Sequence, residues 1–136
     1  MKAARTIIFT LLILGVAAIL IVKHQGAGNS AAMKAIADAK AQGKPAWLFI
    51  HSANDPLSMQ VERIFNDLQP EYARRIVFIN VDSGNPAEKG LLKKYGVTSF
   101  PTSIYFDSSG KAVEKKIGEK PADEYKDTLA QLLEIS

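Results

Sequence analysis

Hydrophobic residues follow two alternating patterns between residue 31 and the C-terminus. Short, nearly unbroken apolar runs predict buried strands, and apolar positions three and four residues apart predict helices packed on a core. The runs predict strands over residues 47–50, 76–81, 102–106 and 111–117, and the spaced positions predict helices over residues 31–42, 56–70, 86–96 and from Pro121 onward. The order α-β-α-β-α-β-β-α is typical of an α/β domain.

The same pattern predicts how the strands are arranged. Residues 76–81 are mostly apolar, as expected for a central parallel strand that is buried on both faces. Residues 102–106 and 111–117 flank the polar turn Asp107–Gly110 and predict a hairpin. The sheet is therefore expected to combine parallel and antiparallel pairs.

One stretch joins a predicted strand to an exposed helix N-terminus. The apolar run Trp47–Ile50 is followed by a polar turn. Asp55 suits the N-cap, because its carboxylate can accept free backbone N–H groups of the first helical turn. Pro56 suits the first helical position, where no N–H donor is needed. The helix that follows is expected to bury Leu57, Val61, Ile64, Phe65 and Leu68.

The N-terminus carries a different pattern, a continuous apolar segment over residues 6–22. As a helix it would be about 25 Å long, slightly short of a typical hydrocarbon core. Lys2 and Arg5 precede the segment and Lys23 follows it, which favours a cytoplasmic N-terminus. We predict a signal anchor and transmembrane helix over residues 1–25, followed by a linker over 26–30 and one domain over 31–136.

Cleavage is the alternative to anchoring. The small residues at 16–18 and at 26–28 could each form a signal-peptidase site. An uncleaved segment predicts a single-pass protein of the cell membrane with its C-terminal domain outside the cytoplasm, on the periplasmic side in a bacterium. A cleaved segment predicts a secreted domain instead.

Three segments resemble thioredoxin-like proteins. Residues 47–65 are similar to the family's strand, turn and active-site helix, residues 80–97 to its next strand, loop and helix, and residues 95–106 to the segment around its cis-proline. The resemblance covers residues 32–135. It implies a three-layer α/β sandwich with a mixed four-stranded sheet, without the family's optional first strand.

The resemblance assigns roles to individual positions, and the chain departs from several of them. The two active-site cysteines would lie at Asp55 and Ser58, and Pro101 would be the cis-proline after Phe100. The chain contains no cysteine, and thiol–disulfide exchange requires an attacking thiolate. Phe49 lies where the family often has a buried acid, and Phe78 lies where the family often has the lysine that pairs with this acid. We therefore expect no oxidoreductase activity.

Charge argues against a nucleic-acid partner. Three of the 17 basic residues, Lys2, Arg5 and Lys23, flank the apolar segment, so 14 remain to balance the 14 acidic residues. A formally neutral domain lacks the basic face that a nucleic-acid binder needs. The sequence also offers few metal ligands beside His51 and Asp55. We predict neither a metal nor a cofactor.

The resemblance leaves a surface for binding. In this family the loop before the cis-proline pairs its main chain with an extended peptide, and such pairing gives affinity without chemistry. We expect a redox-inactive adaptor, assembly factor or chaperone-like domain that binds an exported protein or peptide. The predicted binding residues are His51, Asn54, Asp55, Pro56, Ser58, Ser99, Phe100 and Pro101.

Two alternatives remain open. The first is a non-redox enzyme, for which Ser58, His51 and Asp55 could form a hydrolase triad, or an accessory subunit of a thiol–disulfide oxidoreductase system. The second is a degenerate domain that acts only as a spacer on its anchor. The sequence does not specify an oligomeric state.

Overall fold

The computed structural model describes residues 30–136. The predicted signal anchor over residues 1–25 and nearly all of the linker lie outside the described residues. Within residues 30–136, no helix is long and apolar enough to cross a membrane.

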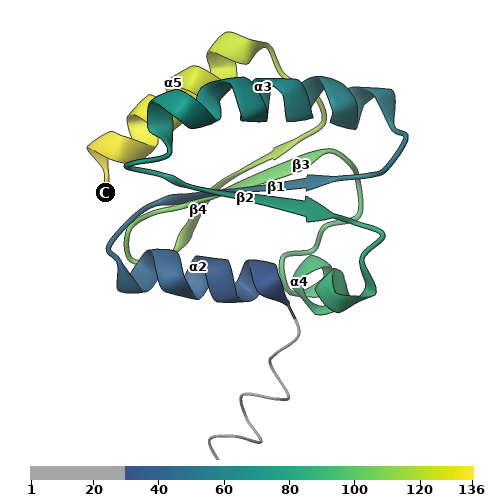
Figure 1. The fold of residues 1–136 in the computed structure, drawn as a ribbon, viewed down its shortest axis with the longest axis horizontal. Helices are drawn as coiled ribbons and strands as arrows, with labels where there is room; N and C mark the ends of the chain where they lie inside the picture. The colour runs from purple at the N-terminus through teal and green to yellow at the C-terminus, as the bar shows by residue number, and fades with distance from the viewer. Residues whose placement is uncertain (1–29) are drawn as a thin grey trace, which may run out of the picture.

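The elements follow the predicted order and form three layers. A four-stranded sheet in the order β2-β1-β3-β4 lies between α3 and α5 on one face and α2 and α4 on the other (Figure 1). The strands β1 and β2 are parallel, whereas β3 is antiparallel to both β1 and β4. This confirms the mixed α/β sandwich. The elements are α2 (Ala31–Ala41), β1 (Ala46–His51), α3 (Pro56–Tyr72), β2 (Val77–Asp82), η1 (Pro86–Glu88), α4 (Lys89–Lys94), β3 (Thr102–Phe106), β4 (Ala112–Ile117) and α5 (Ala122–Glu134).

The strand β2 lies at an edge of the sheet, so its predicted central position was wrong. The two central strands are β1 and β3. The apolar residues of β2 have another cause: Ile79 and Val81 pack in the α2-side core, and Phe78 packs against the α3-side core, whereas Asn80 and Asp82 are exposed. Apolar residues on a strand indicate that other elements pack on its faces, but they do not show how many strands are hydrogen bonded to it.

Two predictions about α3 also need correction. The helix does not end at Pro70 but continues to Tyr72, whose side chain is buried. A proline near a helix C-terminus removes only one intrahelical bond, and the buried Tyr72 keeps the last turn in place. Leu57 is 44% exposed rather than buried. The buried face of α3 begins at Ser58 and Val61.

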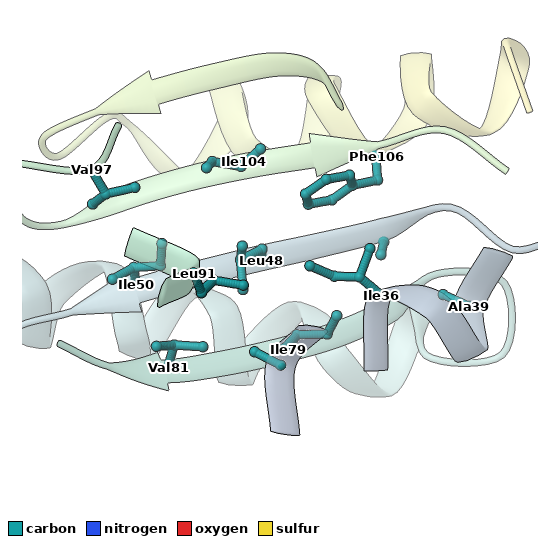
Figure 2. Packing of buried hydrophobic residues seen from close by; sticks show 12 residues of the cluster. Ile36, Ala39, Leu48, Ile50, Ile79, Val81, Leu91, Val97, Ile104 and Phe106 are labelled. Carbon is teal, nitrogen blue, oxygen red and sulfur yellow. The ribbon is translucent and has the colours of Figure 1, made fainter. Parts of the chain in front are cut away.

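Two hydrophobic clusters, one on each face of the sheet, hold β1 in place. The cluster on the α2 face is mainly aliphatic and includes Leu48 and Ile50, with Phe106 as its buried aromatic residue (Figure 2). The other cluster is aromatic, and Trp47 lies at its centre, with ring-centroid distances of 4.9 Å to Phe65 and 5.5 Å to Tyr125. Successive β1 side chains point to opposite faces, so both clusters fix the strand. Its C-terminal end is therefore a rigid support for the turn that follows.

Candidate functional site

The register of the central strands brings two loops together. Ile50 near the end of β1 pairs with Thr102 at the start of β3, and the two strands are antiparallel. The chain that leaves β1 and the chain that enters β3 therefore lie side by side at one end of the sheet. We call residues 52–58 the active-site turn and residues 98–101 the proline loop. These two segments contain seven of the eight predicted binding residues, and His51 lies at the adjoining end of β1.

Asp55 caps α3 as predicted. Its backbone is extended, and one oxygen of its carboxylate accepts the N–H of Ser58 at 2.9 Å. Pro56 occupies the first helical position. Asn54, immediately before the cap, has a φ of 65° in the left-handed region, which asparagine tolerates better than most residues. The local sequence Asn-Asp-Pro therefore fixes a tight turn into the helix.

Ser58 closes the active-site turn from the inside. The side chain is 1% exposed, and its hydroxyl oxygen accepts the N–H of Ser52 at 3.1 Å. The Ser58 hydroxyl also lowers the pKa of Asp55, and the Ser58 backbone N–H adds to this effect. Both interactions favour the ionised carboxylate. Asp55 thus carries a negative charge and Ser58 a structural hydroxyl at the two positions where the resemblance would place cysteines.

His51 is not linked to these groups. Its Nδ1 is buried and has no hydrogen-bond partner among residues 30–136. The ring instead stacks near Phe49, with a centroid distance of 5.7 Å. A hydrolase triad requires the histidine to bridge the serine hydroxyl and the acid, whereas here the Ser58 hydroxyl accepts the Ser52 N–H and the Asp55 carboxylate accepts the Ser58 N–H. Across the described part of the chain, no group of three or more His, Asp or Glu side chains could hold a metal.

The proline loop has the predicted backbone form. The peptide bond between Phe100 and Pro101 is cis. Hydrogen bonds fix the loop on both sides of Phe100, because the Ser99 carbonyl accepts the Thr102 hydroxyl at 2.7 Å and the Pro101 carbonyl accepts the Gly118 N–H at 2.8 Å. The loop is thereby tied to β3 and to the end of β4.

Phe100 is the exception within this loop. Neither its N–H nor its carbonyl is hydrogen bonded to another group in residues 30–136. Its side chain is partly buried against the α2-side core. Buried main-chain groups are nearly always hydrogen bonded. The free N–H and carbonyl of Phe100 can therefore bond either to water or to the main chain of a partner.

Exposed apolar side chains lie beside these elements. Leu57 and Met59, in the first turn of α3, are 44% and 48% exposed. Ile117, which pairs with Thr102 at the end of β4, is 54% exposed. Sequence reasoning missed Met59 and Ile117 as site residues and assigned Leu57 to the core. Helical spacing alone cannot distinguish an apolar residue at the edge of a buried face from one just outside it.

The positions behind the active-site turn are fully apolar. Phe49 is completely buried, and its ring lies 5.3 Å from that of Phe65. The ring of Phe78 lies 5.4 Å from that of Trp47. Where the resemblance implies an acid and a lysine, the chain therefore has two packed aromatic side chains. Neither side chain can accept or donate a proton.

Comparison with known proteins identifies the family. Residues 32–133 match the thioredoxin-like domain family, and the chain belongs to it. The fold also resembles that of thioredoxin O2 from Arabidopsis thaliana in its oxidised state, with a TM-score of 0.64 and 18% sequence identity, over 74% of this chain and 84% of that one. A comparison with curated proteins gave no match. The chain is thus a thioredoxin-like domain without cysteine.

Proposed function

We propose that this protein is a redox-inactive, membrane-anchored thioredoxin-like domain that binds an extended segment of another exported protein. The binding site consists of the active-site turn and the proline loop. The protein acts as an adaptor, an assembly factor or a chaperone-like factor and makes no covalent bond to its partner.

The free main chain of Phe100 carries this proposal. Its N–H and carbonyl are unpaired among the described residues, while bonds at Ser99 and Pro101 hold the loop in position. An extended peptide could pair with these two groups and form a short two-stranded ladder. A preorganised loop loses little entropy when it binds, and this favours affinity.

The surrounding surface supports an apolar partner. Leu57, Met59 and Ile117 expose apolar side chains near the two loops, and Phe100 is itself only partly buried. Apolar anchors beside paired main chains provide both specificity and affinity in strand-type recognition. The carboxylate of Asp55 is already engaged with Ser58, so it contributes negative charge rather than reactivity.

Anchoring and export are part of the same proposal and rest on the sequence. The apolar segment over residues 6–22 has a basic head and is long enough to span a slightly thinned bilayer. We infer that it holds the domain outside the cytoplasm. The absence of cysteine provides a clean test: with Lys126→Cys as the only thiol in the full chain, a membrane-impermeant maleimide should label it from outside the cytoplasmic membrane. Labelling only after the membrane is permeabilised would contradict the proposed orientation.

The binding proposal is tested by photo-crosslinking in intact cells. A photoreactive amino acid is placed at Phe100, and a matched control is placed at Lys126, an exposed residue of α5. We expect a discrete adduct from position 100 and none from position 126. Equal smears from both positions, or no adduct from either, would contradict the binding function and favour a spacer.

A further inference from the structure

The two helix layers of the domain carry opposite charge. The helices α2 and α4 on one face of the sheet contain five lysines and one acid, Asp38. The helices α3 and α5 on the other face contain seven acids and two basic residues (Figure 1). The formal neutrality of the domain therefore conceals a charge asymmetry. The α2–α4 layer is basic, which net charge alone could not predict.

The lysines of this layer are exposed and are not in salt bridges. Within residues 30–136 both observed salt bridges belong to Lys116, on β4. The acid nearest to α4 in sequence, Glu88, is buried and already accepts the Ser30 hydroxyl and the Ala32 N–H. The positive charge is therefore available to an external anion. We call the five lysines the basic face: Lys34, Lys40, Lys89, Lys93 and Lys94.

A hollow of about 170 Å³ lies between α2 and α4 within the basic face. Lys40 and Lys94 line it together with apolar side chains that include Met33 and Tyr95, and the described lining contains no acid. The Lys94 Nζ lies 5.4 Å from the centre of the Tyr95 ring, and the stem of Lys40 passes close to Gly110. Lysine stems that pack in this way keep their ammonium groups in solvent. Two cations beside an apolar lining suit the phosphate of a lipid headgroup.

The predicted anchor joins the domain at the edge of the same face. Ser30 caps α2, and its hydroxyl donates to Glu88 just before α4, so the starts of both helices are held together where the chain enters the domain. Only residues 23–29 separate Ser30 from the predicted membrane segment. Seven residues span at most about 25 Å when fully extended. The basic face therefore begins within that distance of the predicted membrane segment.

We propose that the basic face docks on anionic lipid headgroups of the membrane that holds the anchor, with a headgroup phosphate bound by Lys40 and Lys94. The inference rests on the anchoring proposed above but not on the Phe100 site. Each lysine near an anionic surface favours binding by about fivefold, so five lysines are enough to orient a tethered domain. A nucleic acid offers similar charge, but a short tether holds lipid phosphates at high effective concentration.

The test uses the full chain in lipid nanodiscs and exploits the absence of cysteine. A fluorophore is attached at Ala41→Cys, exposed at the C-terminal end of α2 and about 15 Å along the helix from Ser30. The comparison position is Ala130→Cys, exposed on α5. Nitroxide groups on the lipid headgroups quench a nearby fluorophore. In discs that contain phosphatidylglycerol, position 41 should be quenched several-fold more than position 130, and high salt should remove the difference.

Two double variants with the same change in net charge separate the basic face from the overall charge. Lys93→Gln with Lys94→Gln should weaken docking about 25-fold and largely abolish the quenching at position 41. Arg63→Gln with Lys126→Gln removes two exposed charges of the opposite layer and should leave the quenching unchanged. Discs of phosphatidylcholine alone should give the parent chain little difference between the two labelled positions.

The anchoring and the docking fail in distinguishable ways. A full chain that does not enter the discs would contradict the anchoring and overturn both. A chain that enters the discs but shows equal quenching at positions 41 and 130, or equal quenching in the two double variants, would overturn the docking alone. So would quenching that requires two chains per disc, which points to a second copy, or oligonucleotide binding without quenching, which points to a nucleic acid.

Discussion

The two loops of the candidate site lie side by side at one end of the sheet but differ in how many of their hydrogen-bonding groups are free. In the active-site turn the polar groups are engaged with each other, since Asp55 accepts the Ser58 N–H and Ser58 accepts the Ser52 N–H. In the proline loop, Phe100 leaves both main-chain groups unpaired within the described chain. The active-site turn is thus closed by its own hydrogen bonds, whereas the proline loop has main-chain groups free to pair with a partner of the kind proposed above.

This difference separates recognition from chemistry. Exchange of disulfides needs thiolates in the turn, whereas strand-type recognition needs only a free main chain and nearby apolar surface. Losing the cysteines removes the first without affecting the second. A thioredoxin-like fold therefore does not imply thioredoxin activity, but its peptide-binding geometry can persist.

Restoring two cysteines would give the largest change. The double variant Asp55→Cys, Ser58→Cys places thiols in the turn at the N-terminus of α3, where a thiol pKa is lowered. We expect it to reduce a disulfide substrate with dithiothreitol as the source of electrons, while the parent chain, which has no cysteine, shows no exchange.

The reaction of this variant forms and breaks two disulfide bonds in turn. One thiolate attacks the substrate disulfide, the second thiol resolves the mixed disulfide, and the oxidised pair is reduced again by dithiothreitol. The single variant Asp55→Cys is the control, and without dithiothreitol it should stop at the mixed disulfide. Failure of the double variant to form its internal disulfide on oxidation would show that the turn no longer has the required geometry.

Truncation of Phe100 should give the next largest effect. Phe100→Ala removes an apolar anchor and is expected to weaken partner binding about tenfold, a typical loss for an interface residue of this kind. Phe100→Leu keeps most of the apolar volume and should lose much less. Binding is measured with the partner captured at this position, and urea unfolding of each variant corrects for the contacts that Phe100 makes with the core. Equal binding by both variants and the parent would contradict an anchoring role.

Removal of the Ser58 hydroxyl should affect stability rather than binding. Ser58→Ala leaves the Ser52 N–H without its acceptor, which is expected to lower the free energy of unfolding by about 1–2 kcal/mol. Ser99→Ala is the matched control, because only the carbonyl of Ser99 takes part in the observed bonding. Urea denaturation measures both. If Ser58→Ala lost partner binding but not stability, the active-site turn would be a binding element rather than a structural cap, which contradicts the roles given to the two loops.

The smallest expected effect concerns acid stability. Folding lowers the pKa of Asp55 below its ordinary value of 3.8, first through the Ser58 hydroxyl. The ionised cap therefore stabilises the fold fully above about pH 3.8, and this contribution is lost as the pH falls through the lowered pKa. In Asp55→Asn, the urea midpoint should therefore fall less steeply with decreasing pH below pH 4 than in the parent protein.

Asp107 provides the comparison for this measurement. Its pKa is also lowered, first by the Ser109 hydroxyl, in the turn between β3 and β4. Asp107→Asn should likewise reduce the fall of the urea midpoint below pH 4, while photo-crosslinking from position 100 stays unchanged. If the midpoint of Asp55→Asn ran parallel to that of the parent from pH 7 to pH 2, Asp55 would not be an ionised cap.

The sequence predicted the fold well because its local signals agreed. Apolar runs located all four strands, and Asp55 and Pro56 marked the start of α3. The position of β2 could not be read in the same way, since an edge strand that packs against helices through Phe78, Ile79 and Val81 can be nearly as apolar as a central one. The end of α3 was misplaced because Pro70 is tolerated in a final turn held by Tyr72.

The site was predictable only in part. The resemblance located the cis bond before Pro101, which the structure confirms. The free main chain of Phe100 depends on which carbonyls Thr102 and Gly118 occupy, and this cannot be derived from residue types. The exposure of Ile117 likewise depends on the β3–β4 register. Such features appear only when distant segments are brought together.

Hydrogen exchange at the proline loop tests the central claim most directly. The full chain is mixed with the partner captured by crosslinking at position 100, and deuterium uptake is compared with and without it. If the partner pairs with the main chain of Phe100, exchange should slow in the segment 97–104 and remain unchanged in α5, over residues 122–134. Unchanged exchange in the proline loop, with protection elsewhere, would contradict the account.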